Sequence, residues 1–474
     1  MLHIPLLRNG KQYTSLKQSE IVDHRTGEVL ATMSQANSGL IVRDIKNSKK
    51  VWQSLQNMSL AETLDICKKA ADLFLKEEIP FANTTQTPEQ FVNYQSASTG
   101  MPKNMCRANM EKVHWVLTNL AEIIKSLSGR VDFSIIEKGY GVQDGIPISF
   151  LPQARHLGAV LPSNSPGVHS LWVPALALRV PIVLKPGSRE PWTPFRLLHA
   201  FMEAGYPSEA LSCYPTDYAG GNNIMLHCER AMIFGDDSTV RLWENDRRVE
   251  VHGSGFSKVL IGQDIVENWE QHLDMLFTSI MANGGRSCIN ASAIWTPKYG
   301  REIADALAKR MVKTIPLPLD HEQAKLSAFS DKRIAEYINQ AIEIGLDTEG
   351  AEDMTAKYRD TERFSICEGS AFVHPTLIHV DSYDHPLANR EFMFPFASVV
   401  EMPQEQMLKT IEKSLVVTAI TNDSNWERDL LCCPHIDRLN IGSAPTCKVD
   451  WLQPHEGNLF EFLFQRRSFQ KNSI

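Results

Sequence analysis

The 474-residue chain lacks the features that mark several large classes of protein. Lys and Arg form no basic run of the kind that a nucleic-acid backbone requires, and the net charge of −8 also argues against a nucleic-acid partner. The longest apolar tract, residues 171–184, is interrupted by two prolines and one arginine. It is too short and too broken to span a membrane, so we expect no membrane span.

Cysteine pairs at metal-site spacing are also missing. The nine cysteines are scattered with no Cys-x-x-Cys, and the adjacent pair Cys432-Cys433 would chelate a single ion poorly. We therefore expect no metal. The first residues lack the basic and apolar regions of a secretion signal, so we expect a cytoplasmic protein with reduced thiols.

Strand-like and helix-like segments alternate along most of the chain. Strands are expected at 157–161, 181–186, 231–235 and 258–262, with helices at 168–178 and 193–204 between them. A second alternating series follows residue 288. Apolar residues at helical spacing predict further helices at 48–76 and 109–128, whereas 39–42 and 131–151 resemble strands. The pattern predicts an α/β fold with doubly wound parallel sheets and ligands at the carboxyl ends of strands.

Cys288 stands out because two glycines precede it and small residues follow it, in the stretch Gly284-Gly285-Arg286-Ser287-Cys288-Ile289-Asn290-Ala291-Ser292. Glycines let the backbone approach a ligand closely, and small neighbours leave the sulfur reachable. A structural cysteine more often lies among large apolar residues, where burial makes it inert. We therefore interpret Cys288 as a nucleophile, the alternative being a buried structural thiol.

Four separate stretches, in order, resemble the aldehyde dehydrogenase superfamily over about residues 30–445. These are Leu161-Pro162-Ser163-Asn164-Ser165-Pro166, Val183-Leu184-Lys185-Pro186, Gly284-Gly285-Arg286-Ser287-Cys288 and Glu391-Phe392-Met393-Phe394-Pro395. The resemblance implies two Rossmann-like domains and a small β element that bridges subunits into a homodimer or homotetramer. We expect a dinucleotide-binding domain at 1–131 and 154–254, a catalytic domain at 255–446, and the bridging element at 132–153 and 447–474.

The resemblance implies covalent chemistry at Cys288. Its sulfur would attack the carbonyl carbon of an aldehyde or acyl thioester, giving a thiohemiacetal or acyl-enzyme. The side-chain amide of Asn164 would stabilise the oxyanion together with the backbone N–H of Cys288. Considered alone, Asn164 would more simply be a turn residue before a proline.

The same resemblance implies a bound NAD or NADP. Lys185 would bind the adenosine ribose or its phosphate, Glu391 the ribose beside the nicotinamide, and Pro162 and Gly235 would also contact the cofactor. Solvated or plain turn residues are the alternative at each position. Ser188 stands where NAD-preferring members usually have glutamate, and Arg189 follows it. This pair predicts that the 2′-phosphate of NADP is tolerated.

Two further positions depart from the family pattern. His252, or Glu250 in a shifted alignment, stands where hydrolytic members carry a glutamate base, and the short segment 234–240 that precedes it resembles the acyl-CoA reductase branch. Phe394 replaces a glycine and is expected to narrow the nicotinamide end of the site. We therefore favour coenzyme A as co-substrate, converting acyl-CoA to aldehyde or the reverse. A hydrolytic enzyme that uses His252 as its base and a non-catalytic relative remain the alternatives.

Overall fold

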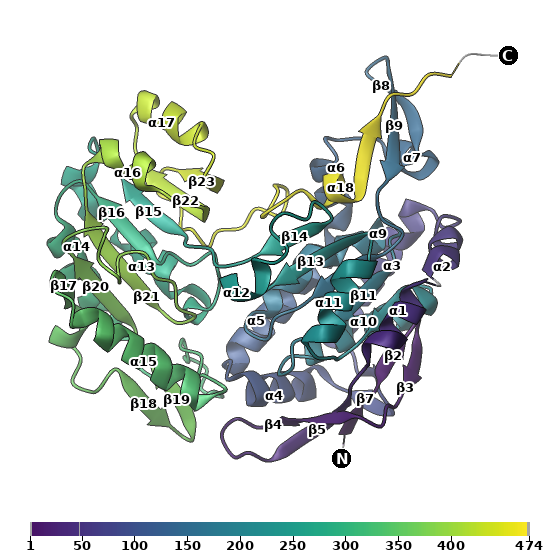
Figure 1. The fold of residues 1–474 in the computed structure, drawn as a ribbon, viewed down its shortest axis with the longest axis horizontal. Helices are drawn as coiled ribbons and strands as arrows, with labels where there is room; N and C mark the ends of the chain where they lie inside the picture. The colour runs from purple at the N-terminus through teal and green to yellow at the C-terminus, as the bar shows by residue number, and fades with distance from the viewer. Residues whose placement is uncertain (1, 47, 472–474) are drawn as a thin grey trace.

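Two seven-stranded sheets organise the chain, one in each of two large lobes, and a smaller arm projects from the first lobe (Figure 1). The computed structural model describes residues 2–46 and 48–471. Both sheets are mainly parallel and are covered by helices, so the predicted α/β fold with two doubly wound domains is confirmed. None of the helices among these described residues is long and apolar enough to cross a membrane.

The sheet of the first lobe has the strand order β14-β13-β10-β11-β12-β2-β3. The first five strands are parallel, and β2 and β3 add an antiparallel edge. In chain order the strands are β2 (Leu6–Arg8), β3 (Lys11–Tyr13), β10 (Leu157–Val160), β11 (Ile182–Lys185), β12 (Leu211–Cys213), β13 (Arg230–Phe234) and β14 (Val249–His252). The order reverses at β10, so a ligand site is expected where β10 and β13 end.

Helices of the first lobe pack around this sheet through a large apolar core that includes Trp172, Trp192 and Phe195, all fully buried. They are α1 (Ser38–Lys46), α2 (Ser48–Leu55), α3 (Leu60–Lys76), α4 (Pro88–Thr99), α5 (Lys103–Thr118), α6 (Leu120–Leu127), α8 (His169–Trp172), α9 (Pro174–Ala177), α10 (Trp192–Glu203), α11 (Tyr218–His227) and α12 (Asp237–Val240). Two small sheets complete the lobe. They contain β1 (Leu2–Ile4), β4 (Gln18–Val22) and β5 (Val29–Ser34), and the hairpin β6 (Ile79–Phe81) and β7 (Thr84–Gln86).

The sheet of the second lobe has the order β17-β20-β21-β16-β15-β22-β23, parallel except at β17. Its strands are β15 (Lys258–Ile261), β16 (Ala293–Thr296), β17 (Ala351–Asp353), β20 (Thr376–Val380), β21 (Phe396–Glu401), β22 (Ser414–Ile420) and β23 (Ile436–Ile441). The hairpin of β18 (Phe364–Cys367) and β19 (Ser370–Val373) lies beside it. The helices are α13 (Leu273–Met281), α14 (Gly300–Met311), α15 (Lys332–Leu346), α16 (Gln404–Thr410) and α17 (Ser424–Leu431).

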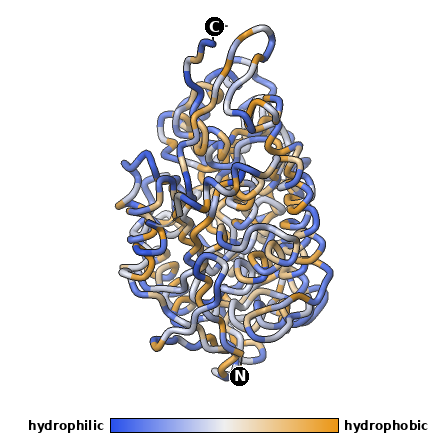
Figure 2. The backbone as a smooth tube through the Cα atoms, turned by 90° about the vertical axis from the view of Figure 1, so that its right-hand side faces the viewer, coloured by the Kyte–Doolittle hydropathy of each residue, from blue (hydrophilic) through white to orange (hydrophobic). Residues whose placement is uncertain are grey.

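The arm joins two segments that are far apart in the sequence. Strand β24 (Phe464–Arg467), which follows helix α18 (Leu459–Leu463), pairs with β9 (Ile146–Pro152), and β9 pairs with β8 (Tyr140–Gln143). Figure 2 shows the arm rising above the body of the molecule, with the C-terminus at its tip. The apolar side chains of Val142 and Ile146 are 64% and 57% exposed on this arm.

Two local predictions from the sequence are wrong. Residues 39–42 belong to helix α1, where Asn37 Oδ1 accepts the Leu40 N–H, 2.9 Å away. Residues 133–138 form helix α7 (Phe133–Lys138), because Asp132 caps its first turn and Gly139 ends it with a positive φ. The expected helix 168–178 is found as α8 and α9, interrupted at Val173 before Pro174, whose ring does not fit inside a regular helix.

Candidate active site

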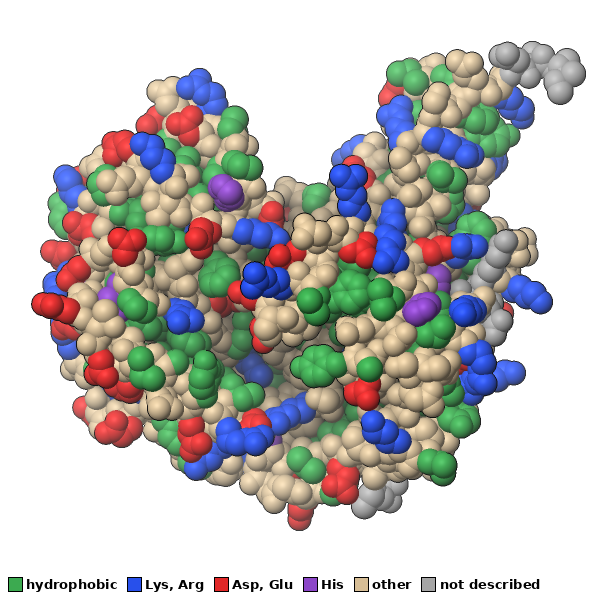
Figure 3. Space-filling model, in the orientation of Figure 1, with side chains coloured by type: hydrophobic (Ala, Val, Ile, Leu, Met, Phe, Trp, Pro, Cys, Tyr) green, Lys and Arg blue, Asp and Glu red, His purple; other side chains and the backbone are tan. Residues whose placement is uncertain are grey.

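A cavity of about 320 Å³ lies where strands β10, β13 and β14 end, facing the second lobe. Figure 3 shows that the molecular surface is hollowed between the two lobes. We call the cavity at the ends of β10, β13 and β14 the catalytic cavity. It brings together six of the residues singled out from the sequence, which are Pro162, Asn164, Gly235, His252, Cys288 and Glu391. Lys185 and Ser188 lie outside its described lining.

The loop before Cys288 is shaped by backbone conformations that favour glycine. Gly284 and Gly285 have φ values of 63° and 66°, in the left-handed region. A Cβ on Gly285 would lie 2.3 Å from the backbone N of Pro395. Opposite the loop, a Cβ on Gly255 would lie 1.9 Å from the carbonyl oxygen of Cys288. Both glycines are therefore required by close packing of backbone around the nucleophile loop.

Side-chain hydrogen bonds fix the position of this loop. The buried Asn290 accepts the Ser287 N–H at 3.0 Å and donates to the carbonyl of Ser279 at 3.1 Å. The hydroxyl of Ser257 donates to the carbonyl of Cys288 at 2.7 Å. Because its backbone is held on both sides, Cys288 presents its thiol to the catalytic cavity from a fixed position.

The thiol of Cys288 lies in surroundings that favour its protonated form. Burial, and secondarily the carboxylate of Glu391, raise its pKa to about 12. The guanidinium of Arg438 acts in the opposite direction and favours the thiolate. The thiol is therefore almost fully protonated near neutral pH, and it needs a nearby base to become a nucleophile.

Glu456 supplies a carboxylate next to this thiol. Its Oε1 lies 3.9 Å from Cys288 Sγ, and its Oε2 contacts Nδ1 of His252. The other ring nitrogen of His252, Nε2, lies 3.3 Å from Oε1 of Glu250. Phe234 stacks on the imidazole with ring centroids 4.2 Å apart and planes 6° apart, which fixes the ring orientation. His252 and Glu250, expected as alternatives from the sequence, both belong to one series of contacts that runs from Glu250 through His252 to Glu456.

Glu456 was missed by the sequence analysis, which assigned residues 447–474 to the bridging element. The segment between β23 and α18 instead runs along the catalytic cavity before it enters the arm, and His455 and Glu456 line the cavity. Glu456 has no motif around it that marks a catalytic carboxylate. Long-range contacts hold this segment, among them the pairing of β24 with β9 and the hydrogen bond between Arg438 and His455.

Asn164 lies in the turn after β10 and lines the cavity. Its Nδ2 donates to the thioether sulfur of Met393 at 3.4 Å. A thioether is a weak acceptor, so little free energy opposes replacing this contact by a hydrogen bond to a substrate oxygen. The side-chain amide is thus available as an oxyanion donor.

The carboxylate of Glu391 already has two backbone partners. It accepts the N–H groups of Gly255 at 3.1 Å and Phe256 at 2.6 Å. Burial nevertheless raises its pKa to about 7. Lys258, buried beneath it, donates to the carbonyl of Phe256 at 2.6 Å. Glu391 therefore orders the segment opposite Cys288 in addition to facing the cavity.

Lys185 ends strand β11 and is half-buried, and burial lowers the pKa of its amine. Ser188 is exposed in the loop that follows. Arg189 is already occupied, because it donates to Ser330 Oγ at 2.6 Å and to Asp331 Oδ2 at 3.4 Å. The prediction that Arg189 and Ser188 together accept a 2′-phosphate therefore depends on Arg189 leaving these partners.

The residues around the sheet reversal have the chemistry that a dinucleotide requires. Gly235 and Gly253 leave the cavity wall without side chains, while Lys185 and Glu391 offer a cation and a carboxylate. Phe394, expected to narrow this end of the cavity, is instead 3% exposed and packs against Phe329 and Phe396. Met393 lines the cavity in its place.

Comparison with known proteins agrees with this arrangement. The sequence profile of the aldehyde dehydrogenase family matches residues 12–414. The 5-carboxymethyl-2-hydroxymuconate semialdehyde dehydrogenase of Escherichia coli is 23% identical over 410 residues, covering 84% of this chain and 83% of that protein. The D-glyceraldehyde dehydrogenase (NADP(+)) of Picrophilus torridus is 23% identical over 390 residues, covering 78% and 73% of the two chains.

Solved structures share the whole fold at low sequence identity. The gamma-glutamyl-gamma-aminobutyraldehyde dehydrogenase of Burkholderia cenocepacia superposes with a TM-score of 0.80 at 15% identity, covering 98% of this chain and 96% of that chain. An NAD+ complex of an aldehyde dehydrogenase from Bacillus cereus has a TM-score of 0.75 at 17% identity, covering 98% and 96%. The profile match over most of the chain shows that this protein belongs to the aldehyde dehydrogenase family of NAD(P)-dependent oxidoreductases.

Proposed function

We propose that this protein oxidises an aldehyde to a carboxylate through an acyl-enzyme on Cys288, with water as the acyl acceptor. The observation that carries the proposal is the carboxylate of Glu456, 3.9 Å from Cys288 Sγ and in contact with His252. This pair provides a base although the family's usual glutamate is replaced by histidine.

The first half of the reaction forms the covalent bond. The Cys288 thiol gives its proton to Glu456, and the thiolate attacks the aldehyde carbon, so a C–S bond forms and the carbonyl π electrons move to oxygen. Asn164 Nδ2 and the Cys288 backbone N–H would stabilise this oxyanion. NAD(P), held by residues such as Lys185 and Glu391, would supply the hydride acceptor that oxidation of this carbon to the thioester requires.

The second half releases the acyl group. Glu456 would first release the proton of the Cys288 thiol to solvent and return to its carboxylate form. A water molecule beside it would then lose a proton to this carboxylate while its oxygen attacks the thioester carbon. The C–S bond breaks, Cys288 leaves as thiolate, and the product is a carboxylate. His252, held by the Phe234 stack, would share the proton with Glu456 and keep the carboxylate oriented.

Coenzyme A as acyl acceptor is the second candidate. It is supported by His252 at the position where hydrolytic members carry glutamate, since loss of that carboxylate would weaken the activation of a deacylating water. In this case the thiol of coenzyme A replaces water, and the same enzyme run in reverse would reduce an acyl-CoA to the aldehyde.

One assay separates the two acceptors. The protein is incubated with an aldehyde series and NAD or NADP, with and without coenzyme A, and the products are identified by mass spectrometry. Carboxylate formed in step with NAD(P)H in the absence of coenzyme A supports hydrolysis. Cofactor reduction that requires coenzyme A, with acyl-CoA as product, would refute hydrolysis and support coenzyme A as the acyl acceptor. Cys288→Ala should abolish both reactions while leaving cofactor binding intact.

The projecting arm is proposed to pair subunits. Val142 and Ile146 are exposed apolar residues on β8 and β9, and β8 is an edge strand of a three-stranded sheet. Such an edge is a site for pairing with a second chain. Sedimentation analysis should show a dimer or tetramer, and Val142→Lys should shift the protein toward the monomer.

A further inference from the structure

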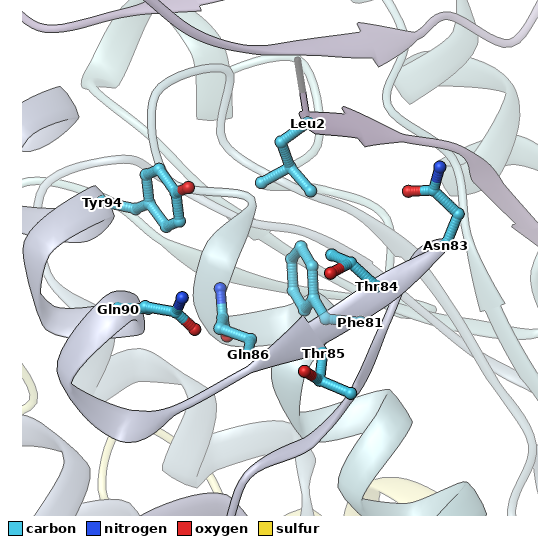
Figure 4. Close-up of a pocket in the computed structure, with 8 residues that line it drawn as sticks. All are labelled: Leu2, Phe81, Asn83, Thr84, Thr85, Gln86, Gln90 and Tyr94. Atoms are coloured by element: carbon cyan, nitrogen blue, oxygen red, sulfur yellow. The ribbon is translucent and has the colours of Figure 1, made fainter.

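A second cavity lies in the first lobe, apart from the catalytic cavity, and shares none of its lining residues. It has a volume of about 340 Å³ and is bounded by β1, the hairpin β6–β7 and the start of α4. Figure 4 shows its lining side chains surrounding a common space, with Leu2, Phe81 and Tyr94 as the apolar contributors. The eight described residues that line it carry no charged side chain.

The orientation of the buried Gln86 amide at this cavity is fixed by Arg196. Gln86 is 2% exposed, and its Oε1 accepts a hydrogen bond from Nη1 of Arg196 at 3.4 Å. Because a guanidinium can only donate, the amide oxygen must face Arg196 and the amide nitrogen must face away from it. Figure 4 shows this nitrogen pointing between Tyr94 and Phe81. Gln86 Nε2 has no hydrogen-bond partner within the described part of the chain.

A second amide is oriented in the same way by the capping box of helix α4. Gln90 Oε1 accepts the backbone N–H of Thr87 at 2.9 Å, so its Nε2 is the end left for a ligand. Both glutamines therefore offer N–H donors to the cavity. A ligand that matches them must present acceptor oxygens.

A buried positive charge lies behind Gln86. Arg196 is fully buried and is bound by carbonyl oxygens of Phe74, Gln86 and Glu77, at 2.9, 2.7 and 2.7 Å. Among the described residues, no carboxylate lies within salt-bridge distance of it. Glu78 accepts a hydrogen bond from Thr85 at the rim, but it is exposed to solvent, which screens its charge. A buried cation without a carboxylate favours negative charge in the adjoining space.

The apolar walls are already ordered without a ligand. The rings of Tyr94 and Phe81 both stack on Trp192, with centroids 4.8 and 6.3 Å away. Trp192 is fully buried, and its indole N–H donates to Ser98 Oγ at 2.9 Å. Rigid walls reduce the conformational entropy that a ligand must overcome.

We propose that this cavity is a binding site for a small carboxylate that carries an apolar ring or chain. The carboxylate oxygens accept from Gln86 Nε2 and Gln90 Nε2, above the buried charge of Arg196. The apolar part lies against Leu2 and Tyr94. This site is separate from the catalytic cavity, so it stands whether or not the proposed reaction is correct.

The test compares three probes that share one ring. Benzoate, benzamide and benzylamine carry a carboxylate, a neutral amide and an ammonium on the same phenyl group. In isothermal titration calorimetry on the full chain, benzoate should bind with the highest affinity and benzamide more weakly. Benzylamine should not bind. Cys288→Ala is titrated beside the unmodified protein, and equal benzoate affinity in both assigns the heat to a site other than the catalytic cavity.

Gln86→Glu is the decisive variant because it keeps the shape of the side chain and removes both N–H donors. Its carboxylate would face Arg196, so the fold should be as stable as before or more stable, while benzoate affinity falls at least tenfold. Gln90→Glu should weaken binding in the same direction, and Gln406→Glu, an exposed glutamine on α16, should leave it unchanged. Unchanged benzoate affinity in Gln86→Glu and Gln90→Glu, or tighter binding of benzylamine than benzoate, would overturn the proposal.

Discussion

Replacement of Glu456 by glutamine tests how the Cys288 thiol is activated. Burial raises the pKa of this thiol to about 12, so at pH 8 only about one molecule in 10⁴ carries the thiolate without help from a base. Forming it from the thiol costs about 5.5 kcal/mol at this pH, at about 1.4 kcal/mol for each pKa unit. Glu456 Oε1, at 3.9 Å from Sγ, is the carboxylate positioned to accept the proton.

We therefore expect Glu456→Gln to lower kcat/KM at pH 8 by about 10²- to 10⁴-fold, the range for loss of a positioned base. The pH dependence should change as well. Without the base, activity should rise about tenfold for each pH unit from 8 to 10, because only free thiolate reacts and the thiol pKa lies above this range. The unmodified enzyme should show a much weaker rise over this range, because Glu456 accepts the thiol proton.

The measurement is a pH profile of kcat/KM for Glu456→Gln, with Glu461→Gln as the matched control. Glu461 is an exposed carboxylate on helix α18, five residues along the same segment, and it does not line the catalytic cavity. Glu456→Asp should recover part of the activity. A Glu456→Gln profile with the same dependence on pH as that of the unmodified enzyme, or a loss of activity below threefold, would refute the assignment.

Further predictions concern the cavity walls and the cofactor. Gly255→Ala should lower steady-state activity at least 100-fold, because its Cβ would lie 1.9 Å from the Cys288 carbonyl oxygen. Gly39→Ala in helix α1 is the control and should leave activity unchanged in the same assay. Ser188→Glu should weaken NADP binding at least tenfold relative to NAD in a fluorescence titration, since a carboxylate repels the 2′-phosphate; equal weakening of both cofactors would contradict this placement. Glu391 has a pKa raised to about 7 from 4.5, so its folded form binds the proton more tightly and stability is lost as pH rises from about 4.5 to 7. Urea unfolding should therefore show that the free energy of unfolding of Glu391→Gln, measured relative to that of the unmodified protein, rises by up to about 3 kcal/mol between pH 4.5 and 8. A difference in unfolding free energy that does not change with pH would contradict this expectation.

The parts of this fold that were predictable are those with a local sequence signature. Alternating strands and helices gave both sheets, and Gly284-Gly285 before Cys288 marked the nucleophile loop. The motif around Asn164, the proposed oxyanion donor, placed this residue in a turn after a strand. These features depend on backbone conformation or on strand ends, which short stretches of sequence encode.

The remaining features depend on contacts between distant segments. The segment of Glu456 is held by long-range contacts, among them the pairing of β24 with β9 more than 300 residues earlier in the chain and the hydrogen bond between Arg438 and His455. Phe394 was expected near the nicotinamide, yet its ring packs with Phe329 and Phe396 in the core of the second lobe. Helix α7 was misassigned because alternating apolar residues resemble a strand, whereas capping by Asp132 and Gly139 decides for the helix.

The fate of the acyl group is tested most directly by turnover in water enriched in oxygen-18. The enzyme is given aldehyde and NAD(P) without coenzyme A, and the product is analysed by mass spectrometry as NAD(P)H accumulates. Hydrolysis assisted by Glu456 and His252 predicts one carboxylate for each NAD(P)H, with at least one solvent oxygen in each carboxylate and none formed by Cys288→Ala. Acyl-CoA formed only after coenzyme A is added, with no labelled carboxylate, would contradict the account.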